Sequence, residues 1–165
     1  NFISLEKLKN HDIGKVIFLR HALAPGNGDP PNFNVKDCTT QRNLNQAGIV
    51  QSRMIGQSFK KTGIKFSKIY SSFWCRCIDT ALNMKVGEFE THDGLNSFYE
   101  RYANRKITLK KLNNLIMSFE KSDGPYLLVT HYVNILAYTG LSTSSGGMVA
   151  FDLNSKESIH IKLKD

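Results

Sequence analysis

The stretch that decides the fold is Val16-Ile17-Phe18-Leu19-Arg20-His21-Ala22-Leu23-Ala24-Pro25-Gly26-Asn27, in which an apolar run ends in an arginine, a histidine and a loop of small residues. Four apolar residues in succession, bounded by Gly14 and by Pro25-Gly26, predict a strand that is buried on both faces. Arg20 and His21 then lie at its carboxyl end. In an open α/β sheet that end borders the crevice in which ligands bind.

A guanidinium beside an imidazole at such a place suits a phosphoryl group. The fork of an arginine binds two phosphoryl oxygens, and a neutral histidine can attack phosphorus. The alternative is an ordinary strand-end histidine whose ring bonds to a backbone carbonyl. On this stretch alone, both interpretations of His21 stay open.

Length and composition predict one globular domain over residues 1–165. A chain of 165 residues buries one sizeable core, and its 41% hydrophobic and 22% charged residues are typical of globular proteins. No apolar run approaches the roughly 18 residues of a membrane span. The sequence begins at Asn1 without an initiator Met or a signal-like segment. We therefore expect a cytoplasmic protein, or an exported and periplasmic one if a leader was removed.

The balance of charged residues favours an anionic ligand. Twenty-two Lys and Arg against fourteen Asp and Glu give a formal charge of +8, which steers anions toward the protein. The lysines are scattered and no basic motif is interleaved with aromatic residues, so we predict a solvated surface and no nucleic-acid partner. The three cysteines, Cys38, Cys75 and Cys77, have no zinc-like spacing and indicate neither a disulfide scaffold nor a metal site.

Hydrophobic periodicity places the helices and strands. It predicts a short helix around Leu5 and Leu8, a helix from Asn43 to Lys61, a strand, loop and helix over 66–84, a helix over 107–119, and strands at 126–129, 148–153 and 158–163. A long loop over 24–41 and an irregular segment over 92–105 separate them. The pattern predicts an α/β three-layer sandwich, with a mostly parallel central sheet, helices on both faces and an antiparallel edge.

Three predicted strands end in groups that suit one anionic site. Arg20 with His21 follows the first strand, Ser71-Ser72 with Arg76 follows the second, and His131 follows the strand at 126–129. Two arginines and two histidines would neutralise a phosphate dianion and supply a nucleophile. Separately, Arg76 has the alternative of a surface ion pair with Asp79, and His131 that of a helix cap. Recurrence at equivalent strand ends favours the shared site.

At these residues the chain resembles the histidine phosphatase superfamily of phosphoglycerate-mutase-like enzymes, most closely its short bacterial phosphatases. The resemblance covers residues 15 to about 153 in the family's order. It rests on Arg20-His21-Ala22 with Asn27, on Leu44 with Gly48 and Gln51, on Ser71-Ser72 with Arg76, Thr80 and Ala81, and on Val129-Thr130-His131.

The resemblance implies a phosphoglycerate mutase-like fold and a hydrolase of phosphomonoesters or phosphohistidine. His21 would become a phosphohistidine intermediate while Arg20, Arg76 and His131 bind the phosphoryl oxygens, with no metal and no cofactor. The partners implied are a small phosphorylated substrate or a phosphoprotein, with a phosphate ion in the pocket. A rival function is a non-catalytic phospholigand-binding module that keeps the same pocket.

Further site residues follow from the same resemblance. Asn27 and Ser72 are expected to bind phosphate or substrate. Arg42, near the start of the helix predicted at Asn43, either adds charge at the pocket rim or caps the loop.

The sequence departs from the family at the proton donor. Many members carry a Glu in the loop that corresponds to 95–100, and here Glu100 and Asp29 are the nearest candidate proton donors. If neither reaches the leaving atom, we expect aryl phosphates, acyl phosphates or phosphohistidine to be preferred over sugar phosphates. A mutase would also need a lid and a long insert, so hydrolysis is favoured over phosphate migration.

Two more expectations concern pH and thiols. Activity should fall near pH 6 to 7 if the imidazole pKa values stay roughly unperturbed, although neighbouring arginines should depress the pKa of His21. The resemblance places the segments of Cys38, Cys75 and Cys77 near the pocket entrance. Cys38 would therefore pair with Cys75 or Cys77 in an exported protein, whereas a cytoplasmic protein would keep three free thiols.

Overall fold

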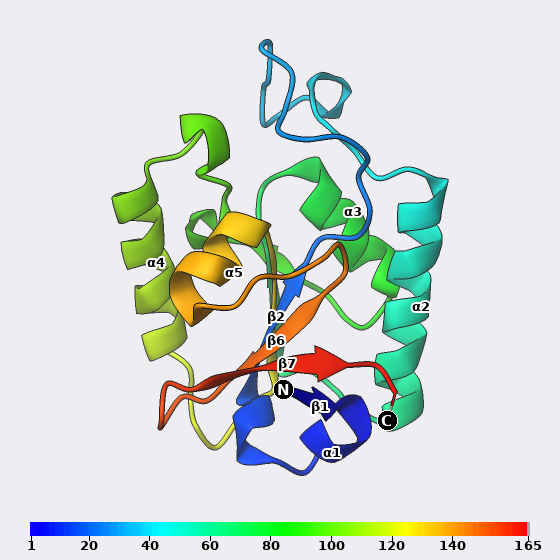
Figure 1. Cartoon of the computed structure of the whole chain (residues 1–165), viewed down its shortest axis with the longest axis vertical. Helices are drawn as coiled ribbons and strands as arrows, with labels where there is room; N and C mark the ends of the chain where they lie inside the picture. Colours follow the sequence, from blue (N-terminus) through cyan, green and yellow to red (C-terminus); the bar gives the residue numbers. More distant parts are fainter. Residues whose placement is uncertain (165) are drawn as a thin grey trace.

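Seven strands form one sheet through the middle of the molecule (Figure 1). The computed structural model describes residues 1–164. The strands are β1 (Phe2–Ser4), β2 (Val16–Arg20), β3 (Lys68–Ser71), β4 (Glu90–Thr91), β5 (Tyr126–Thr130), β6 (Met148–Phe151) and β7 (Ser158–Lys162), and their order across the sheet is β1-β7-β6-β2-β5-β3-β4.

The sheet is mostly parallel, as predicted. β2, β5, β3 and β4 pair in parallel, while β6 runs antiparallel to both β2 and β7. The antiparallel pairing therefore lies on the side of the sheet that contains β6 and β7. The carboxyl ends of β2, β5 and β3 therefore meet at the same edge of the sheet.

Helices cover both faces of the sheet, which confirms the predicted fold class. They are α1 (Leu5–Leu8), α2 (Gln46–Thr62), α3 (Cys75–Met84), α4 (Arg105–Met117) and α5 (Tyr132–Thr139). In Figure 1, α2 and α3 lie on one side of the strands, and α4 and α5 lie on the other. None of these helices is long and apolar enough to cross a membrane.

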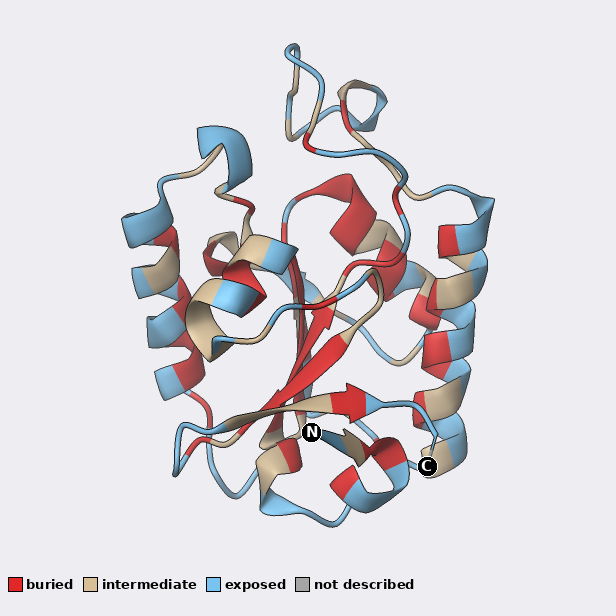
Figure 2. Ribbon diagram, viewed as in Figure 1, coloured by how far each residue is buried: buried red, intermediate tan, exposed pale blue. Residues whose placement is uncertain are grey.

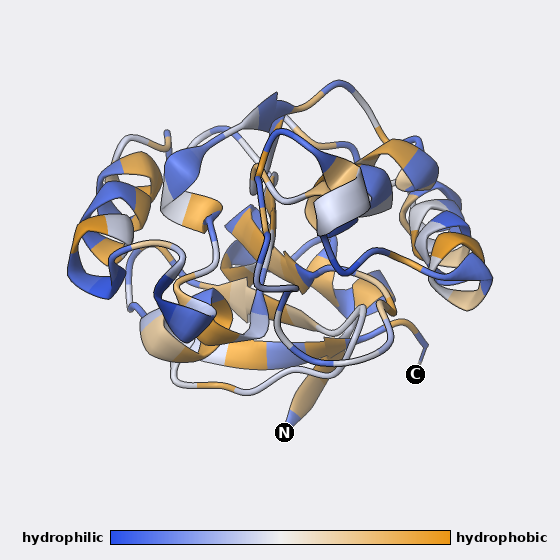
Figure 3. Ribbon diagram, turned by 90° about the horizontal axis from the view of Figure 1, so that it is seen from above, coloured by the Kyte–Doolittle hydropathy of each residue, from blue (hydrophilic) through white to orange (hydrophobic). Residues whose placement is uncertain are grey.

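β2 is the centre of the core because both of its faces are covered. Ile17 and Leu19 pack in the cluster under α2 and α3, whereas Val16 and Phe18 pack in the cluster under α4. Alternate side chains of a strand point to opposite faces, so one apolar run contributes side chains to both clusters. Figure 2 shows this buried centre, and Figure 3 shows that the helices mix polar and apolar residues around the mostly apolar strands.

Two helices begin at different residues from those predicted. α2 begins at Gln46 instead of Asn43 because the side chain of Asn45 accepts a hydrogen bond from Gly48 N, 2.8 Å away. α4 covers 105–117 instead of 107–119, because Asn104 caps the amide of Ile107 in the same way. Asparagine is a favoured N-cap, and a cap fixes the first residue of a helix more closely than apolar spacing does.

Three elements are not among those predicted from the sequence. β1 and β4 have only three and two residues, too few to show an alternating pattern. The sequence of α5, Tyr-Val-Asn-Ile-Leu-Ala-Tyr-Thr, is apolar nearly throughout and gives no helical period.

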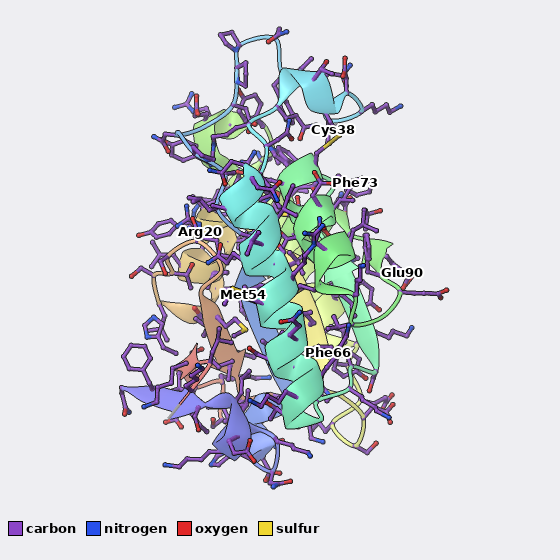
Figure 4. The ribbon with its side chains drawn as sticks, turned by 90° about the vertical axis from the view of Figure 1, so that its right-hand side faces the viewer. Arg20, Cys38, Met54, Phe66, Phe73 and Glu90 are labelled. Carbon is purple, nitrogen blue, oxygen red and sulfur yellow. A yellow bond between two sulfur atoms is a disulfide. The ribbon has the colours of Figure 1, made fainter. Side chains whose placement is uncertain are left out.

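The long loop after β2 projects from the end of the molecule at which β2 ends (Figure 1). A disulfide joins Cys38 in this loop to Cys75, the first residue of α3, with Cα atoms 5.8 Å apart (Figure 4). Of the pairings considered, the structure has Cys38 with Cys75, so the expectations of no disulfide and of three free thiols were wrong. Cys77 is free and buried. The spacing of the cysteines in the sequence does not predict this disulfide, because its two cysteines lie in separate elements.

Candidate active site

The carboxyl edge of the sheet holds a cavity of about 330 Å³. Its wall combines residues that follow β2, β3 and β5 with residues of two loops: Arg20, His21, Asn27, Arg42, Arg76, Ser97, Tyr99, His131, Tyr132 and Val133. The structure therefore brings together both arginines and both histidines of the predicted phosphoryl site.

His21 lies directly after β2 and is only 2% exposed. Its backbone amide donates to Thr130 O, 3.0 Å away, which extends the pairing of β2 with β5. The Nδ1 atom of its ring lies 2.9 Å from Ala22 O. A carbonyl can only accept, so Nδ1 carries the proton and Nε2 keeps its lone pair.

The next turn is fixed to α3 through Thr80. Ala22 N donates to Thr80 Oγ1 at 3.0 Å, and that hydroxyl donates to Arg76 O at 2.7 Å. The histidine turn and the first turn of α3 thus share one buried hydroxyl. This explains why both motifs lie at fixed places relative to each other.

Arg76 reaches His21 from the start of α3. Its Nε atom lies 3.2 Å from His21 Nε2, and its Nη1 atom lies 2.9 and 3.2 Å from the two carboxylate oxygens of Asp29. Both side chains of the ion pair are almost fully buried, at 3% and 2% exposure. The alternative of a surface pair between Arg76 and Asp79 was therefore wrong.

Arg20 contributes a second guanidinium from the end of β2. Its Nη1 donates to Thr143 O at 2.9 Å, and its guanidinium carbon lies 5.4 Å from the ring centre of Tyr132. Its Nε is buried and has no hydrogen-bond partner among residues 1–164. Arg20 is thus held by its neighbours while its buried Nε–H remains unbound.

His131 occupies the N-cap position of α5, but its side chain makes no capping hydrogen bond. Its ring packs edge-on against that of His21, with centroids 5.5 Å apart. Nε2 lies 2.8 Å from Ser72 Oγ, and Nδ1 is buried with no partner in the described chain. The helix-cap alternative for His131 was therefore wrong.

Ser72 lies behind His131 and is not part of the cavity wall. Its hydroxyl also accepts from Trp74 N at 3.1 Å and lies 3.3 Å from Asn96 Oδ1. The Oδ1 atom of Asn96 already accepts from Phe73 N at 2.8 Å. The shorter contact assigns the Ser72 proton to His131 Nε2, which puts the ring proton of His131 on Nδ1.

Burial and neighbouring cations keep both histidines neutral. Desolvation lowers the pKa of His21 well below its usual value, and Arg76 and then Arg20 lower it further. Desolvation followed by Arg76 also lowers the pKa of His131 well below the usual value. The expected loss of activity near pH 6 to 7 is corrected accordingly, because protonation of either ring needs a lower pH.

Arg42 and Asn27 come from the long loop. Arg42 does both of the things considered for it, since its side chain lines the cavity and also donates to Gly28 O at 2.7 Å and to Ala24 O. Asn27 Nδ2 donates to Tyr99 Oη at 3.0 Å across the cavity mouth. The loop is therefore fastened to the site at several points.

Neither candidate proton donor lies in the cavity wall. Asp29 accepts hydrogen bonds from Arg76, from Trp74 Nε1 at 3.1 Å and from Arg42 N at 3.0 Å, so it is the ion-pair partner of Arg76. Glu100 is exposed, and its carboxylate lies against Gly28, where a Cβ atom would come within 1.7 Å of Oε1. The structure thus places both candidate proton donors in or against the loop and outside the cavity wall.

Sequence reasoning missed four residues of the cavity wall, namely Ser97, Tyr99, Tyr132 and Val133. Ser97 and Tyr99 lie in the irregular segment that carries no periodic signal. Tyr132 and Val133 belong to α5, which was not predicted. Their adjacency to His131 in the sequence was the one signal that would have found them.

Comparisons with solved structures identify the fold. Structures of a phosphoserine phosphatase from Entamoeba histolytica in complex with 3-phosphoglyceric acid and of a mycobacterial glucosyl-3-phosphoglycerate phosphatase superpose with TM-scores of 0.59 and 0.57. Identities are 16% and 14%, over 88% of this chain and 93% and 95% of the others. The putative phosphohistidine phosphatase SixA from Agrobacterium tumefaciens superposes with a TM-score of 0.55, 20% identity and coverage of 83% and 89%.

The chain has the fold of the histidine phosphatases. No family model matches the sequence, and no curated protein matches it. The histidine phosphatase fold is thus recognised here from the arrangement of strands and helices, together with the short motifs at the strand ends. The expected resemblance to this superfamily is confirmed at the level of the fold.

Proposed function

We propose that this protein is a metal-independent hydrolase of phosphomonoesters or phosphohistidine, with His21 as the nucleophile. One observation carries the proposal. His21 Nδ1 donates to Ala22 O while Nε2 accepts from Arg76 Nε at 3.2 Å, so Nε2 carries no proton and its lone pair points at a cationic phosphoryl-binding group. The lowered pKa of His21 keeps this nitrogen unprotonated at neutral pH.

The phosphoryl group would bind between the cations of the wall. Arg20, Arg42 and Arg76 carry three positive charges and Asp29 offsets one, which leaves an excess that suits a phosphate dianion. The unbound N–H of Arg20 Nε and the Nδ1–H assigned to His131 are buried donors that a phosphoryl oxygen can satisfy. Ser72 then acts indirectly, because it fixes the tautomer of His131.

The reaction has two steps. Nε2 of His21 attacks phosphorus, the bond between phosphorus and the leaving atom breaks, and the electron pair departs with the leaving group. The oxygen of a water molecule then bonds to phosphorus, the P–N bond breaks with its electron pair returning to Nε2, and inorganic phosphate leaves with the protons of the water. Arg20, Arg76 and His131 stabilise the phosphoryl oxygens in both steps.

The substrate class follows from the site and from the proteins that share the fold. Phosphoserine, glucosyl-3-phosphoglycerate and phosphohistidine are the substrates in the names of the three phosphatases above. We infer for this chain a small phosphorylated molecule or a phosphoprotein, bound with Asn27 and Arg42 at the mouth of the cavity.

The test is turnover of an aryl phosphate by the wild type and by His21→Ala. We expect the substitution to abolish turnover, whereas the exposed histidine variant His11→Ala keeps it. Wild-type protein that binds phosphate but releases none from any aryl phosphate or from phosphohistidine would identify a binding module instead. Equal turnover by His21→Ala would exclude His21 as the nucleophile.

A further inference from the structure

The proposed reaction with an alkyl phosphate needs a proton at the leaving oxygen. An alkoxide is about as basic as hydroxide, the conjugate base of water, whose pKa is about 15.7. Neither Glu100 nor Asp29 lies in the cavity wall, and the three arginines and two histidines there are already assigned to the phosphoryl group and the nucleophile. The wall residues that remain with an O–H group are Ser97, Tyr99 and Tyr132.

None of the three hydroxyls has an acceptor for its proton among residues 1–164, and of the three only that of Tyr99 accepts a hydrogen bond from another side chain. Its phenol oxygen accepts a hydrogen bond from Asn27 Nδ2 at 3.0 Å, and the structure shows no acceptor for the phenol proton among residues 1–164. The side chain is 41% exposed, so it stands at the mouth of the cavity, where a leaving group would emerge. Ser97 is different because its side chain is buried, at 2% exposure, and its Oγ accepts from the backbone amide of Tyr99 at 3.2 Å.

The backbone directly after Tyr99 adopts a strained conformation. Glu100 and Arg101 have φ angles of 56° and 64°, a region that side-chain-bearing residues rarely adopt. Contacts on both sides hold the turn, since Glu100 lies against Gly28 and the Tyr102 hydroxyl donates to Asp29 O at 3.1 Å. Strained backbone that several contacts maintain is typical of functional positions.

We propose that Tyr99 is the proton donor to the leaving group, an inference that rests on the function proposed above. As His21 Nε2 bonds to phosphorus and the P–O bond breaks, the leaving oxygen takes the Tyr99 proton. The hydrogen bond from Asn27 then stabilises the phenolate. In the second step the attacking water gives a proton to this phenolate as its oxygen bonds to phosphorus, which restores the phenol.

A phenol is a weaker acid than a carboxylic acid, but it suits this task. Its ordinary pKa is about 10, so it is protonated at neutral pH and still gives its proton to an alkoxide in a favourable direction. Alkyl phosphates are then substrates, and the expected preference for aryl phosphates, acyl phosphates and phosphohistidine becomes one of degree.

Tyr132 offers a matched control. It also lines the cavity and is similarly exposed, at 37%, but its ring lies beside the guanidinium of Arg20. Replacing Tyr132 by Phe should change the hydrolysis of alkyl and aryl phosphates by the same factor, because that residue acts on the phosphoryl group through Arg20.

The experiment compares kcat/KM for glycerol phosphate and for 4-nitrophenyl phosphate in the wild type, Tyr99→Phe and Tyr132→Phe. A positioned acid contributes about 10²- to 10⁴-fold, and a nitrophenolate needs no proton. We expect Tyr99→Phe to lower the alkyl rate by about 10²-fold or more and the aryl rate by at least about tenfold less. Asn27→Ala should give a smaller loss of the same kind and covers the case in which Tyr99→Phe fails to fold.

Each other outcome has a definite meaning. Equal losses for both substrates in Tyr99→Phe, no loss in either, or a wild type that hydrolyses only the aryl phosphate would overturn the role of Tyr99 and leave the nucleophile of the proposed function intact. A wild type that hydrolyses neither of these substrates nor phosphohistidine would overturn the proposed function itself and, with it, this inference.

Discussion

Asp29 and Arg76 form a buried ion pair in which both carboxylate oxygens lie within 3.2 Å of Arg76 Nη1. The pair connects the long loop to the first turn of α3, and the same guanidinium touches His21 through Nε. Asp29 therefore fixes which edge of Arg76 faces the nucleophile. Arg76 Nη1 binds the loop through Asp29, and Arg76 Nε contacts the nucleophile His21.

Replacing Asp29 by Ala should weaken both folding and phosphate binding. Removing one partner of a buried pair leaves an uncompensated charge and costs about 3 to 5 kcal/mol of unfolding free energy. KM for an aryl phosphate should rise because Arg76 is no longer oriented. Urea unfolding and steady-state kinetics measure the two effects. Asp79→Asn, on the same helix, should change the free energy of unfolding by less than about 1 kcal/mol, and an equal effect of the two variants would contradict this account.

Stability should fall on acidification because two buried histidines stay neutral. Their folded-state pKa values lie well below the unfolded value of 6.5, so between these limits the unfolded chain binds more protons. The loss begins near pH 6.5 and continues until the folded-state pKa values are reached. At about 1.36 kcal/mol per pH unit and histidine, the pair costs about 2.5 kcal/mol between pH 7 and pH 5.5.

Urea unfolding at these two pH values measures the difference. Replacing one of the rings, as in His21→Asn, should roughly halve the difference in unfolding free energy between the two pH values. A wild type that is equally stable at pH 7 and pH 5.5 would show that these rings are not held neutral.

Arg20, Asp29 and Tyr99 show which parts of the site the sequence can predict. Arg20 and His21 were predictable because a buried strand has a clear apolar signature and its carboxyl end is a general location for ligands. The partner of Arg76 was not predictable. Asp29 lies close to Arg76 only because of the course that the long loop takes, and the sequence of that loop has no periodic pattern. Tyr99 was not predictable either, because its segment also lacks a periodic pattern. The backbone conformation next to it depends on contacts with other parts of the chain.

The disulfide was predictable only as one of several alternatives. Its cysteines are 37 residues apart, and nothing in that spacing distinguishes Cys75 from Cys77. The fold does distinguish them, because Cys77 faces the core, where burial raises the pKa of its thiol to about 12. Since disulfides persist mainly in oxidising compartments, the bridge favours the exported alternative over the cytoplasmic one.

Thiol counting should therefore give three different results. The native protein should show no reactive thiol, the unfolded and unreduced protein one, and the unfolded and reduced protein three. Three thiols without reduction would exclude the bridge. For a closed loop of this length the bridge should contribute about 4 kcal/mol to the free energy of unfolding, which a comparison with Cys38→Ser under oxidising conditions can measure.

The central claim is that His21 carries the phosphoryl group during turnover, and trapping that intermediate tests it most directly. The protein is mixed with a ³²P-labelled aryl phosphate, quenched in alkali within the first turnover and digested for mass spectrometry. We predict an alkali-stable, acid-labile label on the peptide that contains His21, absent in His21→Ala and present in His11→Ala. Steady turnover with no label on that peptide, and with equal turnover by His21→Ala, would contradict the account.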